Sequence, residues 1–187
     1  MSWDLGFGLW DLIMSNVAKV SIRPATPGDA ALILAFIHEL AEFEKLPHWV
    51  TATEDAVLEG LFGERPFAEV LVAEAGGAPA GFALFLHNFS TFLARPGLYL
   101  EDLYVRPAFR RQGIGRALLT ELAAIATERH CGRFEWMVLN WNEGARRFYE
   151  SLGAEPLSEW TTYRMTGAPL EALGSLGRAA RAGRSPR

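Results

Sequence analysis

The segment LYLEDLYVRPAFRRQGIGRALLTELAAIATER, residues 98–129, combines a strand, a glycine turn and a helix. Its apolar positions predict the strand over 98–105 and the helix over 114–129, and residues 110–115 form the turn between them. Because the turn opens a helix, backbone N–H groups and the positive end of the helix dipole converge on one small volume. Such a volume favours an anion.

The residues of this turn suit a pyrophosphate. Gly113 and Gly115 carry no Cβ, so a phosphate can approach the backbone closely. Arg110, Arg111 and Arg116 can add charge-assisted hydrogen bonds. The alternative is an ordinary strand-to-helix turn whose arginines are solvated.

Two common phosphate-binding loops do not match. A Walker loop needs Gly-Lys followed by Ser or Thr, which this turn lacks. A dinucleotide fingerprint needs a third glycine at the position of Leu118. The turn therefore indicates a different kind of phosphate site.

Outward from this segment, short strand-like runs alternate with helical patterns. The predicted strands are 18–22, 70–75, 81–89, 98–105, 134–139 and 160–165, and the predicted helices are 26–44, 54–61, 114–129 and 142–152. Thr26 and Asn142 are the expected N-caps of two helices, and Gly153 is the expected left-handed residue after the last one. The order β-α-α-β-β-β-α-β-α-β predicts an α/β (α+β) fold with helices on the faces of a mixed sheet.

The chain has 187 residues, about one domain. We place this domain at residues 17–166. Residues 1–16 are apolar but lack a positive start, so we expect an extension outside the fold, and translation from Met14 is an alternative. Residues 167–187, rich in Ala, Gly and Arg, are predicted to be disordered.

The composition indicates which binding partners and which cellular compartment to expect. A formal net charge of −4 argues against a nucleic-acid-binding protein, and no apolar run reaches the ~18 residues of a membrane span. A single cysteine, Cys131, and four scattered histidines supply neither a disulfide nor a metal-ligand spacing. We expect a metal-free protein of the reducing cytoplasm that binds neither nucleic acid nor membrane.

Several motifs resemble one enzyme superfamily. Arg110, Gly113 and Gly115 match Arg/Gln-x-x-Gly-x-Gly/Ala, motif A of the GCN5-related N-acetyltransferases (GNAT). Further matches are IRPAT at 22–26, LEDLYV at 100–105, WNE at 141–143, RFY at 147–149 and GA at 153–154. Over residues 17–166 they resemble the diamine acetyltransferase (spermidine/spermine acetyltransferase) branch.

The resemblance implies the GNAT fold and acetyl-CoA as the acetyl donor. The fold is a mixed, mostly antiparallel sheet of about six to seven strands with about four helices, splayed where acetyl-CoA binds. The pyrophosphate would lie on the backbone of 111–116 and the pantetheine arm along 103–105. The cofactor-binding residues implied are Leu103, Tyr104, Val105, Arg110, Arg111, Gln112, Gly113, Ile114, Gly115, Arg116, Asn142, Glu143, Gly144 and Ala145.

Acetyl transfer to an amine needs a base for the ammonium and an acid for the leaving thiolate. The resemblance implies Tyr149 as the acid, since a phenol with a pKa of about 10 is protonated at neutral pH; the alternative is a packing ring beside Phe148. It implies Glu101 as the carboxylate that orients and deprotonates the amine. Because adjacent strand residues point to opposite faces, Asp102 is expected to be structural.

Phe43 and Glu44 correspond to an aromatic and acidic pair at the substrate entrance of the family. Glu135, expected opposite Glu101, is a plausible second anchor for the amine. Polyamine acetyltransferases carry further acids downstream, where this chain has Leu46-Pro47-His48-Trp49. A smaller amine, such as a diamine, a lysine analogue of the thialysine kind or another amino acid, therefore fits at least as well as a polyamine.

The resemblance implies direct transfer in a ternary complex, rather than an acetylated Cys131, and a homodimer. Apolar residues at the interface could include Phe85, Phe89, Phe92 and Leu93, although these could equally be core. Two other functions stay open. One is an acetyl-CoA-binding sensor or structural module without turnover, and the other is an enzyme that acetylates a protein amine.

Overall fold

The computed structural model describes residues 20–183, and the chain divides into two compact units, the first ending at Met137 and the second starting at Val138. The first unit contains β1 (Val20–Pro24), α2 (Ala30–Glu44), α3 (Glu54–Phe62), β2 (Glu69–Ala75), β3 (Ala78–Ser90), β4 (Arg95–Val105), α4 (Ile114–Glu128) and β5 (Phe134–Trp136). The second contains α5 (Glu143–Glu150) and α6 (Gly167–Ala182). The extension expected at residues 1–16 lies outside the described residues.

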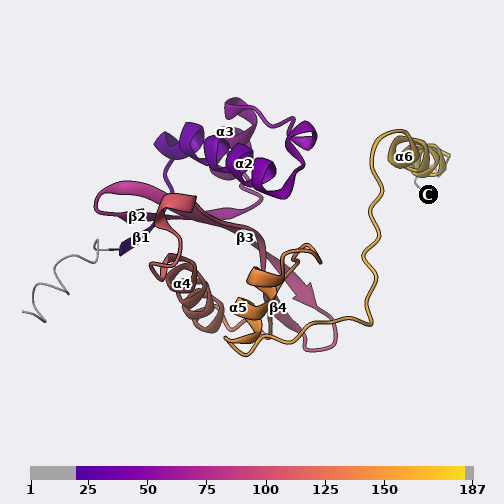
Figure 1. Cartoon of the computed structure of the whole chain (residues 1–187). Coiled ribbons are helices and arrows are strands. Elements are labelled where there is room, and N and C mark those ends of the chain that lie inside the picture. Colours follow the sequence, from indigo (N-terminus) through magenta and orange to yellow (C-terminus); the bar gives the residue numbers. More distant parts are fainter. Residues whose placement is uncertain (1–19, 184–187) are drawn as a thin grey trace, which may run out of the picture. The chain divides into compact units, whose positions relative to one another are not determined.

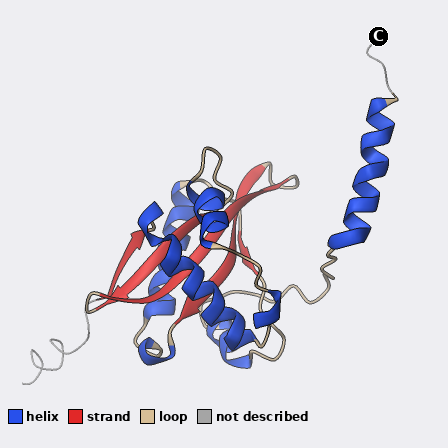
Figure 2. Ribbon diagram, turned by 90° about the horizontal axis from the view of Figure 1, so that it is seen from above, coloured by secondary structure: helices blue, strands red, loops and turns tan. Residues whose placement is uncertain are grey.

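The first unit is a five-stranded sheet in the order β1-β2-β3-β4-β5. Neighbouring strands are antiparallel except β4 and β5, which are parallel, so the predicted mixed and mostly antiparallel sheet is confirmed. Figure 1 shows α2 and α3 on one face of this sheet and α4 on the other, and Figure 2 shows the same layers from above.

The predicted count of six to seven strands is too high. The strand expected over 134–139 ends at Trp136, and residues 160–165 form no strand. Trp160 and Tyr163 are 77% and 92% exposed. An alternating pattern forms a strand only where a neighbouring strand pairs with its backbone and its apolar face is covered, and no described strand pairs with residues 160–165.

The core on the α2 face is aromatic. Phe36 of α2 stacks on Phe82 of β3 with ring centroids 5.2 Å apart, and Tyr104 of β4 meets Phe36 edge-on at 6.4 Å. On the other face α4 buries Leu118 and Leu122 completely. The strand end that precedes the glycine turn is thus fixed to α2 by its Tyr104 ring.

A β-bulge interrupts β4 at Glu101. Leu100 is opposite Phe85 and Asp102 is opposite Leu84, so Glu101 has no partner position of its own on β3. Because Leu84 and Phe85 are consecutive, they point to opposite faces, and directly paired residues share a face. Asp102 therefore points to the α2 face with Leu84, although Leu100, two residues earlier, points to the α4 face.

The second unit confirms some predictions and corrects another. The Asn142 side chain caps α5 by accepting a hydrogen bond from the Ala145 N–H at 3.2 Å, and Gly153 has φ 89° after the helix. The tail predicted to be disordered instead forms α6 over Gly167–Ala182. Alanine, leucine and arginine have high helix propensity, which favours a helix in this segment.

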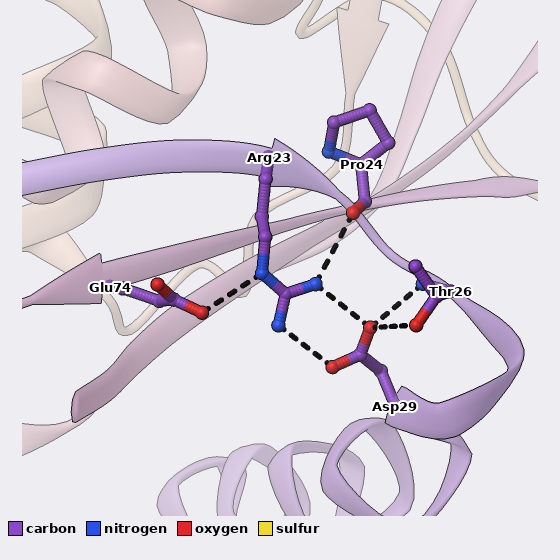
Figure 3. Close-up of polar contacts among 5 residues, drawn as sticks. All are labelled: Arg23, Pro24, Thr26, Asp29 and Glu74. Carbon is purple, nitrogen blue, oxygen red and sulfur yellow. Dashed lines mark hydrogen bonds and ion pairs between the residues drawn. The ribbon is translucent and has the colours of Figure 1, made fainter. Parts of the chain in front are cut away.

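A charge cluster ties β1, β2 and the start of α2 together (Figure 3). Arg23 of β1 donates two hydrogen bonds of 2.8 Å to Asp29 and one of 2.9 Å to Glu74 of β2. Asp29 also accepts from the N–H of Thr26 at 2.7 Å and from its hydroxyl at 2.9 Å. Arg23 and the Thr26 bonds hold the pKa of the Asp29 carboxyl well below its usual range.

We expect Asp29→Asn to lower the free energy of unfolding by about 1–3 kcal/mol at pH 7, because a charge-assisted network loses its anion. The folded-state pKa of Asp29 is below that of the unfolded chain, so its stabilisation is present above about pH 4 and is lost as the pH falls further. Urea unfolding should therefore show a difference between variant and wild type that shrinks on acidification. Glu64→Gln, a change of an exposed carboxylate, is the control; an Asp29→Asn protein as stable as this control at pH 7 would contradict the prediction.

Candidate active site

The glycine turn presents a row of free backbone donors. Among the described residues, none accepts a hydrogen bond from the N–H groups of residues 111–116, and the first helical bond of α4 is Ala117 N–H to Gly113 O at 2.9 Å. Arg111 and Gly113 adopt positive φ of 63° and 82°. Six consecutive donors at a helix N-terminus fit the oxygens of a pyrophosphate.

Beside this turn, β4 has an open edge. Strand β5 pairs only with Leu98–Leu100, and no other described strand pairs with that edge between residue 101 and Val105. Since the Arg106 N–H donates to Ala80 O on β3 at 2.9 Å, the backbone groups of Val105 and Leu103 point the other way, to the open edge. This edge fits the amide-containing pantetheine arm of acetyl-CoA.

Three carboxylates gather where α2 ends beside β4. Burial, together with the negative charges of Glu101 and Glu44, raises the pKa of Asp102 to about 6. Burial also raises the pKa of Glu44. Glu101, at the bulge, is exposed. The cluster is suited to hold an ammonium group and to accept a proton.

The structure also brings Phe43, Tyr104 and Arg110 together. The Arg110 guanidinium lies over the Phe43 ring at 4.6 Å and over the Tyr104 ring at 5.7 Å, and its Nε donates to Val105 O at 2.9 Å. Burial raises the pKa of Tyr104, and the negative charge of Glu39 adds to this. Arg110, predicted as a phosphate ligand, thus contacts β4 and α2.

Glu135 is not where the sequence led us to expect it. It lies beside Tyr99 in the β4–β5 pairing, not opposite Glu101. Its carboxylate forms a 2.8 Å ion pair with Arg133 and accepts a 3.4 Å hydrogen bond from Asn88. The expected position was wrong because β5 pairs with the part of β4 that precedes the bulge.

The remaining predicted residues lie on α5 in the second unit. The side chain of Asn142 caps the helix, and Glu143 forms a 3.0 Å ion pair with Arg147, while Gly144 and Ala145 form the first turn. Tyr149 is half-buried, and its ring centroid lies 5.6 Å from that of Phe148.

Asp102 was expected to be structural, and the structure places its carboxyl on the α2 face, near the charges of Glu101 and Glu44. Sequence reasoning did not predict this cluster. The available signal was a pair of carboxylates inside an apolar strand, LYLEDLYV, which is costly unless the acids have a role. The bulge itself leaves no mark in the sequence.

Residues 20–183 contain no group of three or more His, Cys, Asp or Glu side chains arranged to hold a metal ion. In the same range, no helix has both the length and the apolar character needed to cross a membrane.

Comparisons with known proteins show the family of the chain. A model of the acetyltransferase (GNAT) family matches residues 34–154, more than half of the chain. The chain is 40% identical to a thialysine N-epsilon-acetyltransferase of Sus scrofa, with 84% of this chain and 98% of that protein covered. It is 35% identical to an L-ornithine N5-acetyltransferase of Arabidopsis thaliana, with 83% and 88% covered.

Among solved structures, an integron cassette protein from the mobile metagenome of V. cholerae superposes with a TM-score of 0.71 at 27% identity, covering 83% of this chain and 97% of that one. The chain therefore belongs to the GNAT family of acetyltransferases. It is an enzyme of the acyltransferase class, and the GNAT fold expected from the motifs is confirmed.

Proposed function

We propose that the protein transfers the acetyl group of acetyl-CoA directly to the primary amine of a small molecule in a ternary complex. The acceptor is a diamine, a polyamine or a lysine-like amino acid. The observation that carries this proposal is the row of six unpaired N–H groups at residues 111–116, beside the open edge of β4. Side by side, they suit the diphosphate and the pantetheine arm of one ligand.

The acid cluster supports an amine as the acceptor. Glu44, Asp102 and Glu101 supply negative charge where a cation would enter. The relatives named above act on ornithine and thialysine, which both carry a primary amine on a short chain. The absence of further acids in Leu46–Trp49 favours such short acceptors over long polycations.

The reaction requires a neutral amine, and acetyl-CoA supplies an activated thioester when bound. Glu101, at the exposed position of the bulge, orients the ammonium. Asp102 accepts its proton, directly or through water, because a carboxyl with a pKa of about 6 is a stronger base than an ordinary aspartate. Tyr149 donates a proton or hydrogen bond to the departing sulfur.

We propose further that the enzyme is a cytoplasmic homodimer. Three apolar residues at the tip of the β3–β4 hairpin are exposed: Phe89 by 62%, Phe92 by 96% and Leu93 by 51%. Exposed apolar side chains that lie close together often form the contact between two subunits. Phe85 is buried in the core and so belongs to the fold.

The test is thiol release from acetyl-CoA with a panel of diamines, polyamines, ornithine, lysine and thialysine. We expect saturable turnover with at least one short amine and a smaller kcat/KM for spermine. Tight acetyl-CoA binding without turnover on any amine would favour the sensor, and turnover on peptide lysines alone would favour a protein acceptor. Either result would overturn the proposed function.

A further inference from the structure

Two arginines join the glycine turn to α2. Arg106 donates hydrogen bonds to the Glu39 carboxylate oxygens, from Nε at 3.0 and 3.1 Å and from Nη2 at 2.7 Å. Its guanidinium carbon lies 4.6 Å from the centroid of the Phe36 ring. Arg110, four residues on, places its guanidinium over Phe43.

The contacted residues of α2 lie on one face of that helix. Phe36, Glu39 and Phe43 are spaced by three and four residues, which stacks them along one side. Arg106 also donates to Pro79 O at 2.9 Å, so it anchors the turn to β3 as well. The two arginines thus fasten two turns of α2 to the segment that leads into the cofactor loop.

Arg110 connects two parts of the candidate site. Its Nε binds Val105 O, on the open edge of β4, and its guanidinium plane covers Phe43, which precedes Glu44 of the acid cluster. Arg110 therefore contacts both the edge of β4 that suits the acetyl donor and the end of α2, where Glu44 is proposed to bind the amine.

We propose that Arg110 is a positioning residue. It holds the C-terminal end of α2 against the end of β4, so that the amine bound near Glu44 and the donor bound along Val105 keep a fixed separation. This inference rests on the proposed function. The reaction depends on such registration, because small misplacements of bound groups have large effects on rate.

The role needs the shape of arginine. A planar guanidinium can stack on a ring while its Nε donates sideways, whereas a lysine ammonium supplies a point charge on a flexible stem. The Nη groups of Arg110 have no hydrogen-bond partner within residues 20–183, so a phosphate contact could add to its role. Such a contact would strengthen donor binding without involving α2. A comparison of donors with and without phosphate therefore separates phosphate binding by Arg110 from its positioning of α2.

Arg111 provides a matched comparison. It adjoins Arg110 in the same turn, is exposed, and its side chain makes no hydrogen bond or ion pair within the described part of the chain. Arg111→Lys replaces a guanidinium by an ammonium group, as Arg110→Lys does, but at a side chain that does not contact α2.

The first experiment is amide hydrogen exchange of the free protein, which needs no turnover. In Arg110→Lys we expect faster exchange of the amides that close α2, Lys45 N–H to Glu42 O and Leu46 N–H to Ala41 O. Exchange in β2 and β3 should match the wild type, which shows that the fold is intact. In Arg111→Lys the end of α2 should also match the wild type. Unchanged exchange at 41–46 in Arg110→Lys would overturn the proposal.

The second experiment compares acetyl-CoA with S-acetylpantetheine, a donor without the pyrophosphate and nucleotide. In Arg110→Lys we expect kcat/KM with S-acetylpantetheine to fall about tenfold or more, and KM for the amine to rise. A loss seen only with acetyl-CoA would make Arg110 a phosphate ligand and overturn the positioning role. Absence of turnover in the wild type with every amine would instead count against the proposed function.

Discussion

Tyr149→Phe is expected to lower kcat by about 10²- to 10⁴-fold, the usual contribution of a positioned general acid. The variant keeps the ring on α5 and removes only the hydroxyl that would donate to the departing sulfur. Acetyl-CoA affinity, measured by calorimetry, should stay close to that of the wild type. The loss should therefore appear in kcat and not in donor binding.

The comparison for Tyr149 is its neighbour Phe148, whose ring lies 5.6 Å away. Phe148→Leu alters packing on the same helix without touching the hydroxyl. If Tyr149→Phe keeps full kcat while Phe148→Leu lowers thermal stability, Tyr149 is a packing ring and the proposed acid must be sought elsewhere.

Asp102→Asn is expected to lower kcat/KM for the amine by about 10²- to 10³-fold, because it removes the proton acceptor. The pH profile gives a more specific readout. A carboxylate accepts a proton only when ionised, so the wild-type rate should rise as the pH rises through about 6, the pKa of Asp102. The variant should lose this inflection.

The same substitution should stabilise the fold at pH 8. The folded-state pKa of Asp102 is raised above the ordinary 3.8, so its carboxyl favours folding below that value and loses this contribution as the pH rises through about 6. Ionised at pH 8, it costs as much as about 3 kcal/mol, which asparagine avoids. A higher melting temperature with a lower rate is the expected combination.

Glu101→Gln is the matched control for Asp102. Glu101 is exposed and proposed to orient the amine, so its loss should raise KM for the amine and leave the inflection near pH 6 in place. If Glu101→Gln removes the inflection and Asp102→Asn retains it, the two carboxylates have the reverse assignment.

Much of the first unit could be predicted because its signals are local. Apolar spacing predicted α2 to end at Glu44, as it does, and the Gly76-Gly77 turn joins β2 to β3. In the turn at 110–115, Gly113 has a φ of 82°, a conformation that favours glycine, and this leaves a readable pattern. Local periodicity and turn chemistry are properties of adjacent residues, and so they are visible in a sequence.

The parts that could not be predicted depend on distant partners. The bulge at Glu101 arises from the register between β3 and β4, and it puts Asp102 and Leu100 on opposite faces of the sheet. The contact of Arg110 with Phe43 joins residues 67 positions apart. Charge and motif suggested phosphate for Arg110, whereas the fold supplies a closer aromatic ring.

The row of donors at 111–116 is made of main-chain groups, and this affects how the enzyme can diverge. Most side chains in that row can change without loss of the N–H groups, so the donor site should be robust to mutation. The proposed acceptor site consists of side chains, chiefly Glu44, Glu101 and Asp102, and single substitutions can alter it. New amine specificities can therefore evolve around a constant acetyl donor, which is consistent with relatives that differ in the amine they acetylate.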